Sequence, residues 1–166
     1  AIPMLVQKDN MAMLVRHKVF TESELRSRYE IQLENYCKTV RIEALTMVDM
    51  ARKEILPAVE EYVSDLATAA AAKRAVSAEL SCGYEEKLLH RLTSLVDTMD
   101  GRVDALEEKL VQLDTLRSAT EEAAFICGEI IPAMGELRAV ADESETQTAA
   151  GYWPFPTYGD LLFGVK

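Results

Sequence analysis

The sequence predicts an all-α fold: an elongated antiparallel helical bundle with one long kinked first helix, plus an aromatic, irregular C-terminal tail. Apolar residues recur at steps of three or four over long stretches, which is the spacing of one helix face. Only 7 glycines and 5 prolines occur in 166 residues, which disfavours a fold of many turns. The chain is 49% hydrophobic, so it can bury a core.

The chain opens with a segment of mixed character, residues 1–20, which we interpret as an N-terminal arm. A short helix is expected from about Asp9, as N-cap, to His17. We expect the arm to be cut from a longer chain, because the sequence opens on alanine without a signal-peptide pattern. The spacing of Thr21 and Glu24 is typical of a capping box, which predicts that a helix begins there.

The first long helix is predicted by one continuous apolar stripe. Its residues are Leu25, Tyr29, Leu33, Tyr36, Val40, Ala44, Met47, Ala51, Ile55, Val59, Tyr62 and Leu66. The stripe keeps its phase across Pro57, which therefore predicts a kink and not a chain reversal. We expect the helix to reach about Leu80 and to end at Gly83 in a left-handed conformation.

Two further helices complete the predicted bundle, which spans residues 21–150. The second carries a near-heptad seam of Leu88, Leu92, Leu95, Met99, Val103, Leu106, Leu110 and Leu113. The third begins at a capping box of Ser118 and Glu121 and is kinked at Pro132. Its predicted core stripe is Ala124, Cys127, Ile131, Met134, Leu137 and Ala141.

The length of the first helix constrains the architecture. A helix of about 60 residues is roughly 90 Å long, whereas a compact domain of this size has a radius of gyration near 15 Å. We therefore expect only its second half, about residues 50–80, to pair with 84–114 and 118–148. The first half is expected to project, or to pack against the arm or another chain.

The last segment, residues 151–166, is interpreted as an aromatic docking tail. It holds five of the eleven aromatic residues of the chain, and a disordered tail would not carry so many. Two docking places are open at this point: the bundle itself, or a domain or subunit outside this chain.

Composition and motifs exclude several classes of function. A net charge of −10 disfavours nucleic acid and anionic membranes as partners, and no apolar run reaches the roughly 20 residues that cross a bilayer. Three widely spaced cysteines form neither a disulfide framework nor a metal motif, which favours the cytoplasm. Two of them, Cys37 and Cys127, are expected in the core.

Catalytic machinery is not visible in these residues. No phosphate-binding glycine motif or nucleophile elbow occurs. Neither His17 nor His90 has a glutamate three residues before it, so the di-iron bundle pattern is missing. Paired acids are read as solvated helix faces. We therefore predict no catalytic, cofactor-binding or metal residue in this chain.

Five sequence segments resemble a known protein family. They are residues 1–6 (AIPMLV), 28–39 (RYEIQLENYCKT), 42–51 (IEALTMVDMA), 136–143 (ELRAVADE) and 152–164 (YWPFPTYGDLLFG). In this order they resemble the C-terminal region of type III glutamine synthetases. The resemblance covers both ends and most of the first helix, whereas the stretch from about 65 to 118 agrees mainly in its helical pattern.

The resemblance implies a function for the full-length enzyme. That enzyme ligates ammonia to glutamate through a γ-glutamyl phosphate, uses ATP with Mg or Mn, and is an intracellular, ring-built dodecamer. Its catalytic residues belong to an upstream β-rich domain, so no ligase activity is expected of this segment alone. The implied partners are that upstream catalytic domain and neighbouring subunits of a homo-oligomer.

Aromatic and apolar residues are the candidate interface anchors, because such residues dominate interface hot spots. The candidates are Tyr29, Tyr36, Tyr152, Trp153, Phe155, Tyr158, Leu162 and Phe163. The expected role is docking, subunit assembly or structural support. The alternative is a free-standing helical or coiled-coil interaction module, which the leucine seam supports equally well.

Overall fold

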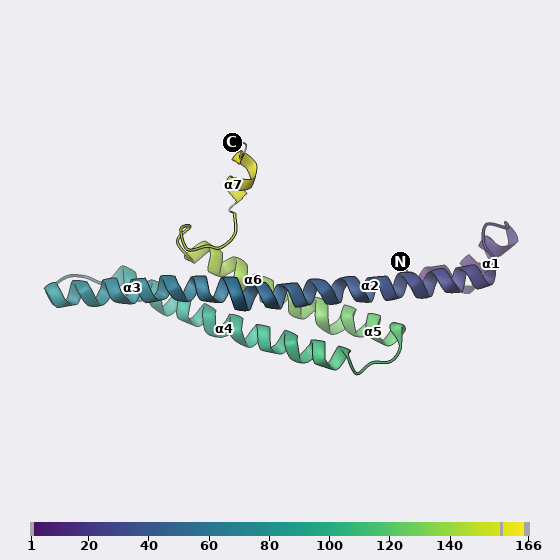
Figure 1. Cartoon of the computed structure of the whole chain (residues 1–166), viewed down its shortest axis with the longest axis horizontal. Coiled ribbons are helices and arrows are strands. Elements are labelled where there is room, and N and C mark those ends of the chain that lie inside the picture. The colour runs from purple at the N-terminus through teal and green to yellow at the C-terminus, as the bar shows by residue number, and fades with distance from the viewer. Residues whose placement is uncertain (1, 157, 165–166) are drawn as a thin grey trace. The chain divides into compact units, whose positions relative to one another are not determined.

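The computed structural model describes residues 2–156 and 158–164, without the side chain of Tyr158, and these residues form helices and no strand (Figure 1). The predicted all-α helical bundle is confirmed. In chain order the elements are η1 (Ile2–Val6), α1 (Lys8–Arg16), α2 (Glu22–Met50), η2 (Ala51–Ile55), α3 (Leu56–Val76), α4 (Gly83–Leu113), α5 (Ala119–Phe125), η3 (Ile126–Ile130), α6 (Ile131–Gln147) and α7 (Tyr158–Phe163). The tail is not irregular throughout, because α7 is a helix.

The chain forms two compact units. The first unit comprises Ala1–Ala44 and Lys109–Pro132, and the second unit comprises Leu45–Glu108 and Ala133–Lys166. This division follows spatial compactness and does not test the predicted arm, bundle and tail, which remain a prediction.

The N-terminal boundaries follow local hydrogen bonding. The N-cap of α1 is Gln7, so the expectation that Asp9 caps this helix is wrong. The predicted capping box is confirmed: the Thr21 amide donates to Glu24 Oε2 at 2.7 Å, and the Glu24 amide donates to Thr21 Oγ1 at 3.3 Å. The Thr21 amide and the Thr21 hydroxyl, which also donates to Glu24 Oε2 at 2.9 Å, hold the pKa of Glu24 below its ordinary value.

The core of the first unit is built on α2. Leu25, Leu33 and Val40 are buried at the spacing the stripe predicts, and Cys37 Sγ lies 3.7 Å from the carbonyl oxygen of Ala119 in α5. The first half of the long helix therefore packs within its own chain. Packing against the arm, one of the expected alternatives, agrees with Ile2 and Pro3, which line one pocket with Tyr29. The helix also has a partner in the chain that the sequence did not predict. It pairs with residues 109–132, because these carry the apolar face that covers it.

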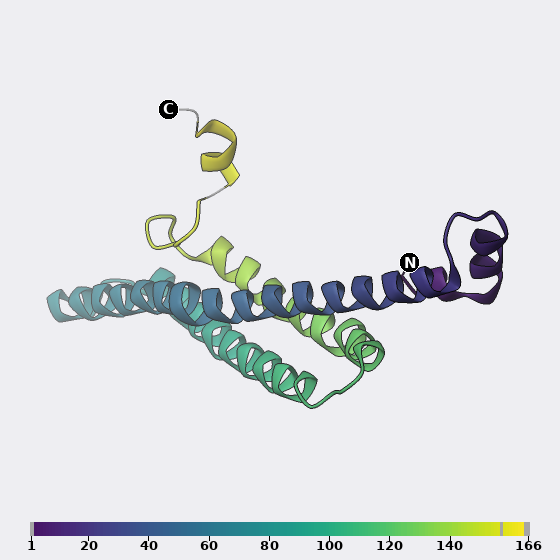
Figure 2. The same ribbon diagram turned by 45° about the vertical axis from the view of Figure 1, so that its right-hand side comes forward.

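In the second unit, α3 and α4 form a hairpin. Both ribbon views show α4 turning back along α3 (Figures 1 and 2). Lys73 pairs with Glu85 and Arg74 pairs with Glu86 across the turn. The expected helix end near Leu80 is wrong: α3 stops at Val76, because Ser77 is extended at ψ 134°.

Gly83 does not take the predicted left-handed conformation. It begins α4, and no described glycine has a positive φ. The predicted seam of α4 is confirmed, since Leu92, Met99, Val103 and Leu106 have no exposed surface.

A charged cluster fixes η2 beside α4 in the second unit. The Arg52 guanidinium contacts Asp104 at 2.5 Å, Glu107 at 2.6 Å and Asp100 at 3.4 Å. These carboxylates raise the pKa of Arg52, Glu107 having the largest effect. The side chain is 37% exposed, so its partners orient the helices more than they stabilise them.

Both helix-interior prolines follow a π-helical turn. Pro57 comes two residues after η2, and Pro132 comes two residues after η3. A proline has no amide proton, and its ring crowds the carbonyl four residues earlier; those carbonyls belong to Lys53 and Gly128, inside the π turns. The wider turns let the helices continue where the sequence predicts kinks.

The third predicted stripe is wrong in its phase before Pro132. The buried residues are Ile126, Ile130 and Ala133, followed by Leu137, whereas Ile131 is 43% exposed. Steps of three and four lead back from Leu137 to either register, and packing selects the larger apolar side chains. The helix begins at the expected place, but the Ser118 side chain makes no cap hydrogen bond, so that capping box is not formed.

Candidate docking sites

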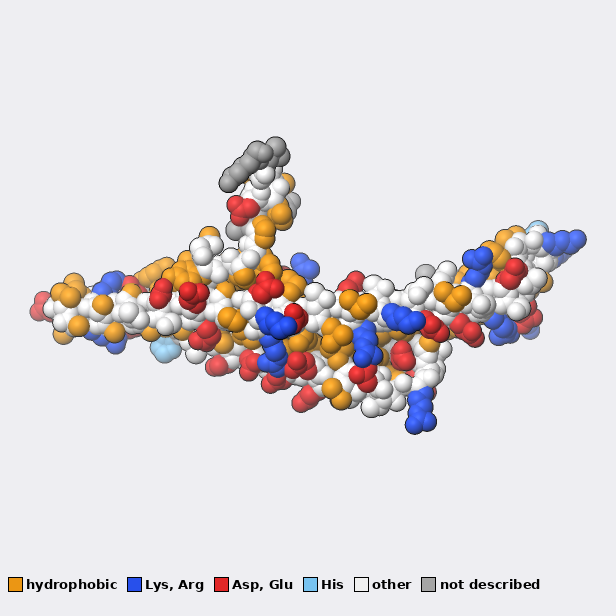
Figure 3. All heavy atoms as spheres, viewed as in Figure 1, with side chains coloured by type: hydrophobic (Ala, Val, Ile, Leu, Met, Phe, Trp, Pro, Cys, Tyr) orange, Lys and Arg blue, Asp and Glu red, His pale blue; other side chains and the backbone are white. Residues whose placement is uncertain are grey.

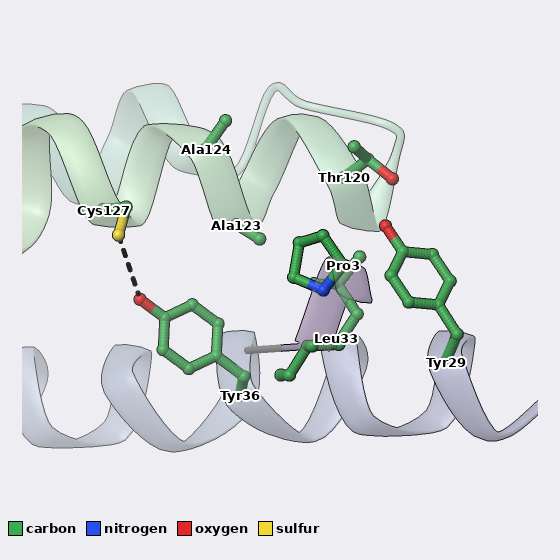
Figure 4. Close-up of a pocket in the computed structure, with 9 residues that line it drawn as sticks. Pro3, Tyr29, Leu33, Tyr36, Thr120, Ala123, Ala124 and Cys127 are labelled. Atoms are coloured by element: carbon green, nitrogen blue, oxygen red, sulfur yellow. Dashed lines mark hydrogen bonds between the residues drawn. The ribbon is translucent and has the colours of Figure 1, made fainter. Parts of the chain in front are cut away.

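The first unit contains an apolar pocket with a volume of about 430 Å³ (Figure 4). It is lined by Ile2, Pro3, Tyr29, Leu33, Tyr36, Thr120, Ala123, Ala124 and Cys127. Two predicted anchors, Tyr29 and Tyr36, thus lie in one site. The volume is within the range of cavities that hold small molecules or a few side chains.

Helical spacing places the aromatic walls of this pocket. Tyr29, Leu33 and Tyr36 stand at positions i, i+4 and i+7 of α2, which share one face. Figure 4 shows both tyrosines rising from α2 toward α5, with Pro3 and Leu33 between them. The facing residues of α5 include Ala123 and Ala124, whose small side chains leave the space open.

Tyr36 and Cys127 meet at one end of the pocket. The Tyr36 hydroxyl lies 3.8 Å from Cys127 Sγ, to which it donates a weak hydrogen bond. Burial raises the pKa of Tyr36, and the thiol contact adds to the rise. Cys127 is exposed, so the expectation that it is a core residue is wrong, whereas Cys37 is buried as expected.

In the second unit, the tail is fixed to the bundle at its first aromatic residue. The Tyr152 hydroxyl donates a 2.5 Å hydrogen bond to Asp65 Oδ2 of α3. The rings of Tyr152 and Tyr62 lie 4.9 Å apart at a tilt of 41°. The bond to the carboxylate raises the pKa of Tyr152.

The next two aromatic residues help to form a groove in the same unit. Trp153 and Phe155 pack edge to face, with ring centroids 6.4 Å apart. Together they line a groove of about 300 Å³, whose other walls include Met47, Met50 and Leu137. All these residues belong to the second unit, so the base of the tail docks on the chain itself.

The end of the tail is different. Leu161, Leu162 and Phe163 of α7 are 71%, 57% and 84% exposed, and hydrophobic side chains lie on the outside of α7 in Figure 3. The side chain of Tyr158, another candidate anchor, lies outside the described part of the chain.

The eight candidate interface residues are therefore distributed among four places: the first-unit pocket, the contact of Tyr152 with α3, the second-unit groove and α7. Sequence reasoning missed Asp65 and Tyr62, the partners of Tyr152. Those partners are separated from Tyr152 by about 90 residues, and no local pattern in one sequence connects them. It also missed the lining role of Ala123, because a small residue on a helix carries no distinctive signal.

Metal and membrane sites were searched over the same residues. Among the residues that the structure describes, no group of three His, Cys, Asp or Glu side chains is placed to hold a metal ion. No helix within residues 2–156 and 158–164 combines the length and apolar character needed to cross a bilayer.

Among the described residues, the fold is an all-α domain with an apolar pocket, a groove and an exposed apolar helix end. Its residues 1–74 match the family described as the glutamine synthetase C-terminal domain. The whole chain is 32% identical over 165 residues to a glutamine synthetase of Butyrivibrio fibrisolvens, covering 99% of this chain and 24% of that protein.

Two more distant relatives agree. A type-3 glutamine synthetase of Dictyostelium discoideum is 24% identical over 167 residues, which cover 98% of this chain and 23% of the relative. A glutamine synthetase of Bacteroides fragilis is 28% identical over 159 residues, which cover 92% of this chain and 21% of that protein. Residues 1–74 therefore resemble the glutamine synthetase C-terminal domain family, and the whole chain is similar to about a quarter of the length of the curated relatives it matches.

Proposed function

We propose that this helical region serves docking and subunit assembly in a type III glutamine synthetase and takes no direct part in catalysis. Its partners are the upstream catalytic domain and neighbouring subunits of a homo-oligomer. The complete enzyme joins ammonia to glutamate at the expense of ATP, with Mg or Mn, in the cytoplasm. The residues that hold nucleotide and metal lie outside this chain.

One observation supports this function above the others. The tail is fixed at Tyr152 by Asp65 and Tyr62, yet three consecutive apolar residues at its end are more than half exposed. Burying an apolar side chain of this size contributes about 1.5–3 kcal/mol. An apolar surface held on a fixed base is a binding element for another surface.

The alternative of a free-standing coiled-coil module needs an accessible seam. Leu92, Met99 and Leu106 have no exposed surface within their own chain. A second helix could reach this seam only by displacing the helices that already cover it. The structure therefore favours docking through the tail and the pocket over pairing through the seam.

Deletion of residues 151–166 from the intact synthetase tests the proposal. We expect smaller assemblies in light scattering or native mass spectrometry, because the candidate anchors Trp153, Phe155, Leu162 and Phe163 are lost. The matched control is Val76→Ser, which changes another exposed apolar residue of the second unit, 81% exposed. Unchanged oligomer mass and activity in the deletion variant would contradict the proposal.

A further inference from the structure

Helix α7 in the second unit has exposed apolar side chains, and the first unit contains an open apolar pocket. We propose that α7 of one copy docks at the first-unit pocket of a second copy, with the side chains of Leu162 and Phe163 inside the pocket. The inference rests on the proposed assembly function and names the contact through which it acts.

The helix side of this contact is α7. Its three apolar residues are consecutive, and Phe163 is 84% exposed. Consecutive residues on a helix cannot all face one surface of their own chain, since each step turns by about 100°. A concave surface can cover more of such a helix end than a flat surface can.

The first-unit pocket is a concave, half-open surface of this kind. Its wall residues are largely apolar, and Tyr29 and Tyr36 present aromatic faces of the kind found at interface hot spots. The volume of about 430 Å³ suffices for a phenyl ring with a leucine side chain. The hydroxyl groups of Tyr29, Tyr36 and Thr120 and the thiol of Cys127 supply the polar side-chain atoms of a largely apolar lining.

Charge favours a contact between the first unit of one copy and the second unit of another over a contact between two second units. The first unit carries nine basic and ten acidic side chains, whereas the second carries nine basic and eighteen acidic ones. Second units of two copies repel each other, while a second unit meets far less repulsion at a first unit.

The symmetry of this contact has a consequence. A contact between two different surfaces is heterologous, so it continues from copy to copy and closes into a ring where the rotation permits. One helix end buries far less than the roughly 1,000 Å² of a stable interface. The contact is therefore weak for one pair and becomes effective when an assembly repeats it.

Cys127 allows the contact to be trapped. It is exposed and lines the pocket, whereas Cys37 and Cys82 are buried. One variant of the 166-residue chain carries Leu162→Cys together with Cys127→Ser, and it is mixed with the unchanged chain and oxidised. A disulfide between position 162 of the variant and Cys127 of the unchanged chain can then form only between two copies.

We expect this mixed disulfide dimer on a non-reducing gel, with the linked peptides identified by mass spectrometry. The control variant keeps Leu162 and carries Val76→Cys together with Cys127→Ser. Position 76 is 81% exposed, and this variant should yield no such dimer. Adding Phe163→Asp to the first variant should abolish the product, since it places a charge in an apolar cavity. A yield no higher than that of the Val76→Cys control overturns the inference.

A variant that carries Leu162→Cys and keeps Cys127 tests whether α7 docks in the pocket of its own chain. If it gives only an internally linked monomer, α7 fills the pocket of its own chain and the inference is wrong. Failure here is distinguishable from failure of the proposed function. If deleting residues 151–166 disrupts the intact synthetase while no mixed disulfide forms, docking stands and its partner surface is a different one.

Discussion

Gly101 lies in the middle of α4, and its replacement by alanine should stabilise the protein. It is exposed on the face opposite the seam, and an added Cβ would meet no atom within 4 Å. Its φ is negative, so the backbone already suits alanine. Alanine in a helix interior is favoured over glycine by about 1 kcal/mol, because glycine loses more backbone entropy on folding.

For a protein of this size, about 1 kcal/mol corresponds to a rise of roughly 2–4 °C in Tm. The assay is thermal and urea unfolding followed by circular dichroism, with the urea slope m compared between variants. An equal m confirms that the midpoint shift reports stability and not a changed unfolded state. Gly135→Ala in α6 repeats the test, since its Cβ also meets no atom within 4 Å.

The matched control is Gly164→Ala. A Cβ at this position would lie 2.3 Å from the carbonyl oxygen of Asp160, so the end of α7 would have to shift. We expect no rise in Tm from this substitution. A lowered or unchanged midpoint for Gly101→Ala, with m unchanged, would refute the reasoning that α4 is a regular helix with its glycine facing solvent.

Three further predictions follow from burial and charge. Leu106→Ala should lower the free energy of unfolding by roughly 2–5 kcal/mol in urea titrations, because Leu106 is fully buried, whereas Val111→Ala, 67% exposed, should change it little. Native alkylation followed by mass spectrometry should modify Cys127 and neither of the two buried cysteines. Because hydrogen bonds from Thr21 lower the folded-state pKa of Glu24, the Glu24→Gln variant should be less stable at neutral pH. That difference should vanish as the pH falls through the lowered pKa.

Long periodic signals in the sequence predicted the fold well. The stripe of the first helix is buried or half-buried at every predicted position from Leu25 to Leu66, and it stays in phase across Pro57. It succeeds because twelve residues at helical spacing specify one face, whatever covers that face. The capping box at Thr21 succeeds because its hydrogen bonds involve only near neighbours in sequence.

The errors arise where two local readings are equally good. Ile130 and Ile131 are adjacent, so either can continue the stripe toward Leu137, and only packing in the folded chain buries Ile130. Cys127 belongs to the same wrongly predicted register as Ile131. It was therefore expected in the core, whereas in the structure it is exposed and lines a pocket. Asp65 and Tyr152 are beyond sequence reasoning for another reason, since their contact depends on the return of a distant segment.

The locations of exposed apolar surface constrain how this region can act. The helices use their long seams against each other, so the middle of the bundle is already committed to its own stability. Apolar surface that another protein could contact includes the first-unit pocket and the end of the tail, and single exposed residues such as Ile42 and Tyr84 lie elsewhere on the helices. Such small, separate surfaces give weak individual contacts, and weak contacts suit an assembly that repeats each one around a closed symmetry. Substitutions in the seam should therefore destabilise the fold, whereas substitutions in α7 or the pocket should weaken association and leave the chain folded.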